Sequence, residues 1–172
     1  MSFINDIKQR AKQDIKTIIL PESNDLRVIK ATEQVLKEGY SDIILIGNKE
    51  EIKKIAQENN IDISKAKIVD PLKSDKFSEY AEKFYELRKA KGMTLDKAKE
   101  IMKDNVYFGM MMVKQGDGDG LVSGACHSTA DTLRPALQIL KTAPGTKLVS
   151  AFFLMVVPNC EYGENGAFVF GD

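Results

Sequence analysis

The sequence predicts an α/β protein with a parallel sheet. Three short apolar runs rich in β-branched residues alternate with helical patterns between residues 17 and 69. That alternation is typical of βαβ units, because parallel strands need a crossover connection. At 172 residues, with 43% apolar and 29% charged residues, the chain has the size and balance of one soluble domain, or of one domain and part of another.

The first elements are indicated by apolar spacing and by residues that cap helices or end strands. An amphipathic helix is expected at the start of the chain, with Ser2 as its cap. The first strand is expected at Thr17–Leu20, where Pro21 ends it. Asn24 is expected to cap a second helix, which Gly39 ends. The apolar positions that indicate these helices are Phe3, Ile4 and Ile7, then Val28, Ile29, Ala31, Val35 and Leu36.

The alternation then repeats. Two further strands are expected at Asp42–Ile46 and Ala66–Val69, with a helix opened by Gly47–Asn48 between them. A helical stretch follows from Ser74 to Lys103, interrupted at Gly92–Met93. These elements complete three strand–helix pairs.

The next segment returns from helix to strand and back to helix. Asn105 is expected to cap a helix over Val106–Lys114. A strand is expected at Asp119–Val122, and a further helix at Ala130–Leu140, ending near Pro144–Gly145.

The pattern changes after Gly145. Nearly continuous strand is expected over Lys147–Val157 and again at Ala167–Phe170. Two apolar strands cannot cover both of their own faces. We therefore expect residues 1–145 to form a first α/β domain and residues 146–172 to begin a second, truncated one. The alternative is an irregular terminal hairpin on the first domain.

Composition excludes several classes of function. The 25 basic residues balance 25 acidic ones, so no basic stripe indicates a nucleic-acid partner. Cys126 and Cys160 make no disulfide framework and no metal-binding CxxC pair. The longest apolar run, Leu148–Val157, is too short to cross a membrane, and the N-terminus lacks the apolar core of a signal peptide. A cytoplasmic protein without a membrane partner is expected.

The glycine-rich segment 115–124, QGDGDGLVSG, fits no standard ligand loop. A calcium loop starting at Asp117 would need an oxygen ligand and a glutamate where Leu121 and Ser128 stand. The sequence also lacks the P-loop and dinucleotide fingerprints. A tight helix-to-strand turn explains Gly116 and Gly118.

The following segment, Ser123–Arg134, has the parts of an anion site. It lies where a strand ends and a helix begins, which is where open α/β sheets bind ligands. Ser128 or Thr129 can cap that helix and leave backbone N–H groups for an anion. Arg134 would then lie about one turn into the helix, where a bidentate grip on phosphate is available. The alternative is simple capping with a solvated arginine.

Three nearby side chains are open to more than one interpretation. His127, the single histidine, is expected to line a pocket or to be structural, since only Asp131 could orient it as a base. Cys126 is expected to be a small buried residue. Arg88 ends a basic helix and is either solvated or, with Lys89 and neighbouring lysines, able to hold the phosphates of a nucleotide-like ligand.

Three segments carry a family resemblance: LPESNDLRVIKA at 20–31, YFGMMMVKQGDGDGLVSGACHSTADTLRPALQILKTAPG at 107–145, and FFLMVVPNCEYGENGAFVFGD at 152–172. The whole chain resembles the N-terminal half of phosphate acetyltransferase, or phosphotransacetylase. The resemblance implies a three-layer α/β/α fold with a mainly parallel sheet, similar to isocitrate and isopropylmalate dehydrogenases, followed by the start of a second α/β domain. It also implies that the active site lies in a cleft between domains.

The resemblance also implies an activity and the residues that serve it. Family members interconvert acetyl-CoA plus phosphate with acetyl phosphate plus CoA, as homodimers without a bound metal or cofactor, coenzyme A being a substrate. Arg134 matches a catalytic arginine that contacts the phosphate group, and Arg88 an arginine implicated in CoA binding. Ser128 and Thr129, with Ser123, match a hydroxyl-rich loop lining the phosphate site. The family's catalytic serine, a second arginine and an aspartate base have no counterpart here, so this chain alone is expected to be inactive.

Three other functions are compatible with parts of the pattern. The chain could belong to a phosphate butyryltransferase, which acts on longer acyl groups. It could form a non-catalytic domain that binds acyl phosphate or CoA, like the portion appended to some malic enzymes. A dehydrogenase of similar fold is disfavoured because the dinucleotide fingerprint is absent.

Overall fold

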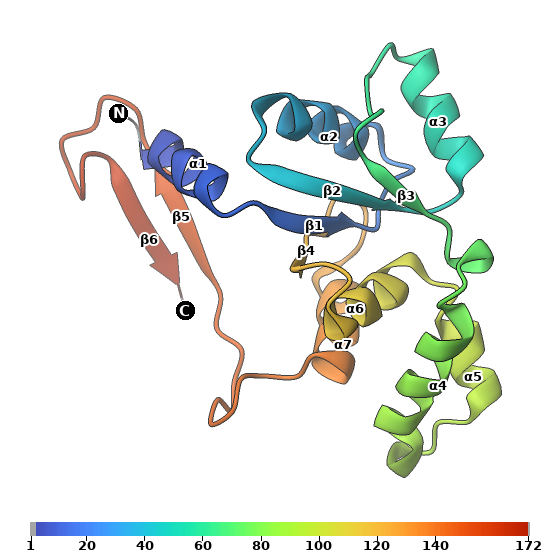
Figure 1. Cartoon of the computed structure of the whole chain (residues 1–172). Coiled ribbons are helices and arrows are strands. Elements are labelled where there is room, and N and C mark those ends of the chain that lie inside the picture. The colour runs from blue at the N-terminus through green and yellow to red at the C-terminus, as the bar shows by residue number, and fades with distance from the viewer. Residues whose placement is uncertain (1–2, 172) are drawn as a thin grey trace. The chain divides into compact units, whose positions relative to one another are not determined.

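The structure is a computed structural model that describes residues 3–171, so the expected Ser2 cap lies outside the described residues. The chain divides into two compact units, and Figure 1 shows the elements of each. The larger unit is formed by residues 11–141, and the smaller by the segments on either side of it. The domain boundary near Gly145 remains a prediction.

The larger unit contains a parallel sheet, as predicted. Its described strands are β1 (Lys16–Leu20), β2 (Ser41–Ile46), β3 (Lys67–Val69) and β4 (Gly120–Leu121). They lie in the order β3-β2-β1-β4, and each neighbouring pair is parallel. The first three strands are confirmed to within a residue. β4 is shorter than expected, although the N–H groups of Asp119 and Val122 still donate to the carbonyls of Thr17 and Ile19 on β1.

Helices cover both faces of this sheet, which confirms the three-layer α/β/α fold (Figure 1). One face is covered by α2 (Leu26–Glu38) and α3 (Lys49–Glu58), and the other by α6 (Asn105–Gln115) and α7 (Thr129–Ile139) with α4 (Phe77–Arg88), against which α5 (Leu95–Ile101) packs. Side chains alternate along β2: Ile43 and Leu45 pack toward α2 and α3, whereas Ile44 and Ile46 join the other core. This alternation is the two-residue period of a strand buried on both faces.

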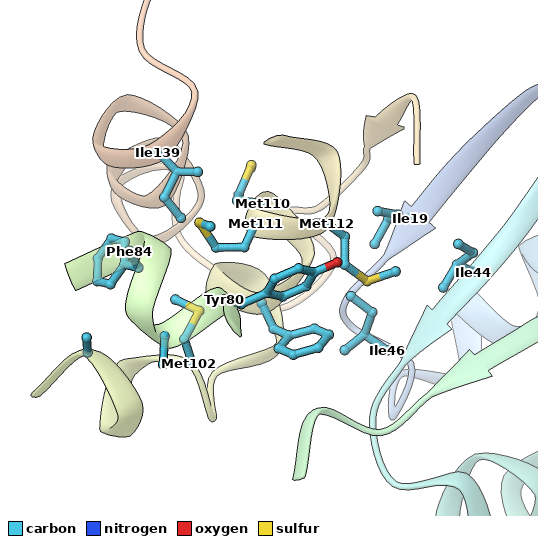
Figure 2. Packing of buried hydrophobic residues seen from close by; sticks show 13 residues of the cluster. Ile19, Ile44, Ile46, Tyr80, Phe84, Met102, Met110, Met111, Met112 and Ile139 are labelled. Carbon is cyan, nitrogen blue, oxygen red and sulfur yellow. The ribbon is translucent and has the colours of Figure 1, made fainter. Parts of the chain in front are cut away.

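The core under α4–α7 is built mainly from aromatic and methionine side chains. Figure 2 shows Tyr80 of α4 and Met112 of α6 on the side of Ile19 of β1, and Met110 and Met111 of α6 toward Ile139 of α7. The methionine run is thus part of the core. Unbranched thioether side chains suit an irregular space between four helices and a twisted sheet.

Two predicted helix caps are wrong by one residue. α2 is capped by Asp25 rather than Asn24, through its side chain and the N–H of Arg27. α6 is capped by Asp104 rather than Asn105, whose Nδ2 instead donates to the carbonyls of Pro21 and Ile46. Both errors have one cause: adjacent Asp and Asn residues are equally good caps, and tertiary contacts choose between them.

Other helix ends follow from left-handed backbone. Gly39 and Gly92 have φ values of 68° and 80°, and they end α2 and separate α4 from α5 as predicted. α7 ends at Ile139, earlier than expected. Lys141 takes a φ of 66° and its N–H donates to the carbonyl of Ala136, which closes the helix.

The smaller unit contains an antiparallel hairpin. β5 (Phe152–Val156) pairs with β6 (Ala167–Gly171), and the unit also takes in the first part of α1 (Phe3–Gln13). The prediction of strand from Lys147 was wrong, because Phe152 pairs with the last residue of β6 and the residues before it have no strand to pair with among those described. Most of the hairpin's apolar side chains are exposed.

Close packing of α6 on the sheet gives a first stability prediction. A Cβ added at Gly109 would lie 2.7 Å from Leu121 Cδ1 and 2.9 Å from Ile46 Cδ1. Gly109→Ala should therefore lower the free energy of unfolding by about 1–3 kcal/mol, even though alanine favours a helix by about 1 kcal/mol. Urea denaturation measures this. Gly120→Ala is the matched control, since its added Cβ would meet only Ile18 Cδ1 at 3.5 Å. Equal stabilities of the two variants would contradict this packing.

Candidate functional site

The strand order reverses between β1 and β4. β2 and β3 lie on one side of β1, whereas β4 lies on the other. Open α/β sheets bind ligands outside the carboxyl ends of their strands at such a reversal. The chain leaves β1 at Pro21–Glu22 and leaves β4 at Val122–Ser123, so the loops that follow these strands meet at this point.

Glu22 joins the two loops. Its Oε2 accepts hydrogen bonds from the N–H groups of Gly124 at 2.9 Å and Ala125 at 2.8 Å. Its Oε1 accepts from the N–H groups of Cys126 at 2.8 Å and His127 at 2.9 Å. The ring Nδ1 of His127 also lies 2.7 Å from Oε1. One carboxylate thus holds four consecutive peptide groups and one imidazole.

The surroundings of Glu22 keep it ionised. Burial alone raises its pKa, but the N–H groups of Cys126 and Ala125 and both donors of His127 outweigh burial and hold the pKa well below the ordinary range for glutamate. The side chain is only 2% exposed. The carboxylate therefore occupies the N–H groups of residues 124–127, which a bound anion could otherwise have used.

Arg27 binds the same loop. Its Nη2 donates to the carbonyl of Ala125 at 2.5 Å and to Asp25 Oδ2 at 2.6 Å. Sequence reasoning assigned no role to Glu22 or Arg27. A signal existed, since an acidic and a basic residue closely follow a buried strand at its carboxyl end, but their partners lie about 100 residues away in the sequence.

The predicted cap of α7 is Ser128. Its Oγ accepts from the N–H of Asp131 at 3.2 Å and donates to Asp131 Oδ2 at 2.6 Å. The Ser128 hydroxyl is thus used within the helix cap. Thr129 is the first helical residue, and the N–H groups of Thr129 and Ala130 precede the intrahelical hydrogen bonds of α7. These two groups are the anion donors that the local geometry offers.

Arg134 lies more than one turn into α7 and faces a small cavity. The cavity has a volume of about 210 Å³ and is lined in part by His127, Asp131, Arg134 and Tyr107. Arg134 Nη1 lies 3.8 Å from Asp131 Oδ1, and the Arg134 side chain is 60% exposed. The guanidinium can therefore turn to an incoming anion at little cost, because so exposed an ion pair is weak.

Arg88 and Ser123 each have a buried polar atom without a hydrogen-bond partner within residues 3–171: the Nε of Arg88 and the Oγ of Ser123. Burial raises the pKa of Tyr107, and the positive charges of Arg134 and Arg88 oppose that rise, so both arginines lie near the same phenol. The structure thus brings Arg88 toward the region of Arg134. Their roles in binding remain predictions.

One group of side chains has the residue types of a metal site. Among the described residues, ligand atoms of Glu22, Cys126 and His127 lie within 4.8 Å of one another. Both Glu22 oxygens already accept N–H groups, and the nearer nitrogen of His127 faces Glu22. The cluster fits an internal hydrogen-bond network better than a cation. No helix within residues 3–171 combines the length and the apolar character that a membrane span requires.

Known families and relatives match the whole chain. The family model described as phosphate acetyl/butaryl transferase matches residues 2–172. Curated relatives include the phosphate acetyltransferases of Thermoanaerobacterium thermosaccharolyticum, 62% identical, and Acetivibrio thermocellus, 60% identical. Both matches cover 100% of this chain, but 52% and 51% of the relatives. The chain thus spans about half the length of the curated relatives it matches.

Solved structures agree. A phosphotransacetylase from Streptococcus pyogenes superposes with a TM-score of 0.89 and 37% identity, over 98% of this chain and 51% of that one. A phosphotransacetylase from Staphylococcus aureus gives a TM-score of 0.85 at 37% identity, over 96% of this chain and 48% of that one.

Proposed function

The chain belongs to the phosphate acetyl/butaryl transferase family, and we propose that the protein transfers an acetyl group reversibly between coenzyme A and inorganic phosphate. The observation that carries this proposal is the crevice at the ends of β1 and β4, where His127, just before α7, and Asp131 and Arg134 of α7 line one cavity. A guanidinium and helix N–H groups together suit a phosphoryl group.

The chemistry assigns a task to each part of this crevice. In the direction of acetyl-CoA formation, the CoA thiolate attacks the acetyl carbonyl, a C–S bond forms, and the C–O bond to phosphate breaks. Arg134 and the N–H groups of Thr129 and Ala130 hold the phosphoryl group and stabilise the charge that it gains as it leaves. Holding it also orients the acetyl group for attack. The base that takes the thiol proton is, by the resemblance, not among these residues.

CoA is the second substrate in this proposal, and Arg88 is its contact. A guanidinium nitrogen that is buried without a partner is costly unless a ligand uses it, and the phosphates of CoA are suitable acceptors. Ser123 Oγ is likewise buried without a hydrogen-bond partner among the described residues, and it would serve the phosphate site. The names of the curated relatives favour acetyl over butyryl as the transferred group.

The remaining features are proposed on the resemblance. The enzyme uses no metal and no other cofactor, and CoA is a substrate rather than a cofactor. It works as a cytoplasmic homodimer. Residues 146–172 begin a second α/β domain, and the exposed apolar side chains of the β5–β6 hairpin are consistent with a surface that further protein covers.

The proposal is tested with two proteins. One is this chain, and the other is a fused protein in which this chain replaces the matching segment of the 62% identical relative. Both should bind acetyl phosphate in calorimetry, whereas only the fused protein should form acetyl-CoA from acetyl phosphate and CoA. Turnover by the chain alone would contradict the division of roles. A folded fused protein without transfer activity would contradict the function.

A further inference from the structure

A buried carboxylate and the single histidine of the chain face each other beside the cavity. Glu22 Oε1 lies 2.7 Å from His127 Nδ1, and the side chains are 2% and 32% exposed. His127 also lines the cavity that Arg134 and Asp131 share. The pair therefore links the buried carboxylate that binds the loop to the cavity in which a ligand would bind.

The hydrogen bonds decide which ring nitrogen carries a proton. An ionised carboxylate can only accept, so the Nδ1 of His127 must be the donor to Glu22. The Nε2 atom, on the far side of the ring, is the nitrogen left for a ligand. A carboxylate that fixes the tautomer and orientation of a histidine in this way is a general device for presenting the other nitrogen.

Electrostatics gives a reason for a histidine between Glu22 and a bound phosphoryl group. The negative charge of Glu22 lies under the loop and would repel a bound phosphoryl group. An imidazolium between the two anions removes that repulsion, because it donates Nδ1–H to Glu22 and Nε2–H to the ligand. The other charged or titratable groups around His127 are Arg27 of α2, which donates to the loop at Ala125, Cys126 beside it, and Asp104, Tyr107, Asp131 and Arg134, which line the cavity.

We propose that Glu22 is a positioning residue that fixes His127 so that Nε2 donates a hydrogen bond to the phosphoryl group held by Arg134. This inference rests on the proposed function for its ligand, although the geometry of the pair does not. Glu22 acts through His127 and the loop, whereas His127 itself touches the ligand.

The spectroscopic test uses the side-chain ¹⁵N resonances of the single histidine in the 172-residue chain. In the ligand-free neutral form, the proton should be on Nδ1. Saturation with acetyl phosphate, or with inorganic phosphate, should shift the Nε2 resonance to the position of a protonated nitrogen. A proton on Nε2 alone in the ligand-free form would overturn the positioning role. Phosphate binding that leaves Nε2 unchanged would overturn the contact with the ligand.

The matched variants are His127→Asn and Glu22→Gln. Asparagine keeps a donor near the position of Nδ1 but has no counterpart of Nε2. The His127→Asn protein should therefore unfold at nearly the wild-type temperature and bind acetyl phosphate at least about tenfold more weakly. Glu22→Gln should weaken binding to a similar degree, and the double variant should bind no more weakly than Glu22→Gln alone, because both changes remove one contact. Glu58→Gln, an exposed residue of α3, is the control and should bind as wild type.

The outcomes distinguish a failure of this inference from a failure of the proposed function. Wild-type affinity in a folded His127→Asn protein would overturn the inference, and so would additive losses in the double variant. If Glu22→Gln does not fold, the spectrum and His127→Asn still decide. If the wild-type protein binds neither phosphate nor acetyl phosphate, the proposed function fails, and the ligand-free spectrum alone tests whether Glu22 positions the ring.

Discussion

Arg134→Gln should reduce kcat/KM for acetyl-CoA formation by about a thousandfold in the fused protein, in line with the loss of an arginine that stabilises a phosphoryl group in a transition state. Glutamine has neither the charge nor the two parallel N–H groups of the guanidinium. The N–H groups of residues 124–127 cannot replace the guanidinium, because they already donate to Glu22. A coupled assay of acetyl-CoA formation measures the loss, and calorimetry with acetyl phosphate shows how much of it is binding.

Two further variants make that result specific. Arg134→Lys keeps the charge but loses the fork, so its activity should lie between those of wild type and Arg134→Gln. Arg10→Gln, in α1, changes the same residue type at a residue that is not among those lining the cavity of Arg134, and it should leave activity unchanged. The role assigned to Arg134 is wrong if Arg134→Gln retains near-normal kinetics, or if Arg10→Gln loses as much.

Glu22→Gln should lower the free energy of unfolding by about 3 kcal/mol at pH 7, the scale of breaking a buried charged network. The amide turns a donor toward N–H groups that need an acceptor, and a partner of His127 loses its charge. Because the pKa of Glu22 is depressed in the folded state, its stabilisation is present above its unfolded value of about 4.5 and is lost as the pH falls below it.

Urea denaturation of both proteins across pH measures this dependence. The difference in stability between wild type and Glu22→Gln should be constant from pH 6 to 8 and should shrink below about pH 4.5, because the carboxylate then becomes protonated in the unfolded chain while it stays ionised in the folded one. A difference that grows on acidification would show that Glu22 is not ionised in the folded state. Glu58→Gln again serves as the control, since an exposed pair contributes little at any pH.

The elements best predicted from sequence were those whose signals are local. β1, β2 and β3 follow from β-branched runs with clear ends, and Gly39 and Gly92 mark helix ends because their backbone is left-handed. Caps at Asp25 and Asp104 were missed by one residue, since their Asn neighbours are equally good caps locally. β5 was predicted too long because strand length depends on where the partner strand ends.

Only part of the candidate site could be predicted from the sequence, again because only some of its signals are local. Ser128 as a helix cap and Arg134 on α7 follow from consecutive residues, so the crevice could be predicted from the strand-to-helix turn alone. The role of Glu22 depends on β4 pairing with β1 rather than with another strand, and strand order is not written in a local pattern. Only that pairing places Glu22 beside residues 124–127.

The most direct test of the central claim is a crystal structure of the protein with acetyl phosphate bound. The phosphoryl group should lie in the cavity at the start of α7, with oxygens in hydrogen-bond distance of the Arg134 guanidinium, the N–H groups of Thr129 and Ala130, and His127 Nε2. A phosphoryl group bound elsewhere would contradict the account, most pointedly in the lysine-lined groove beside β3 that Lys49, Lys67, Lys73 and Lys76 border.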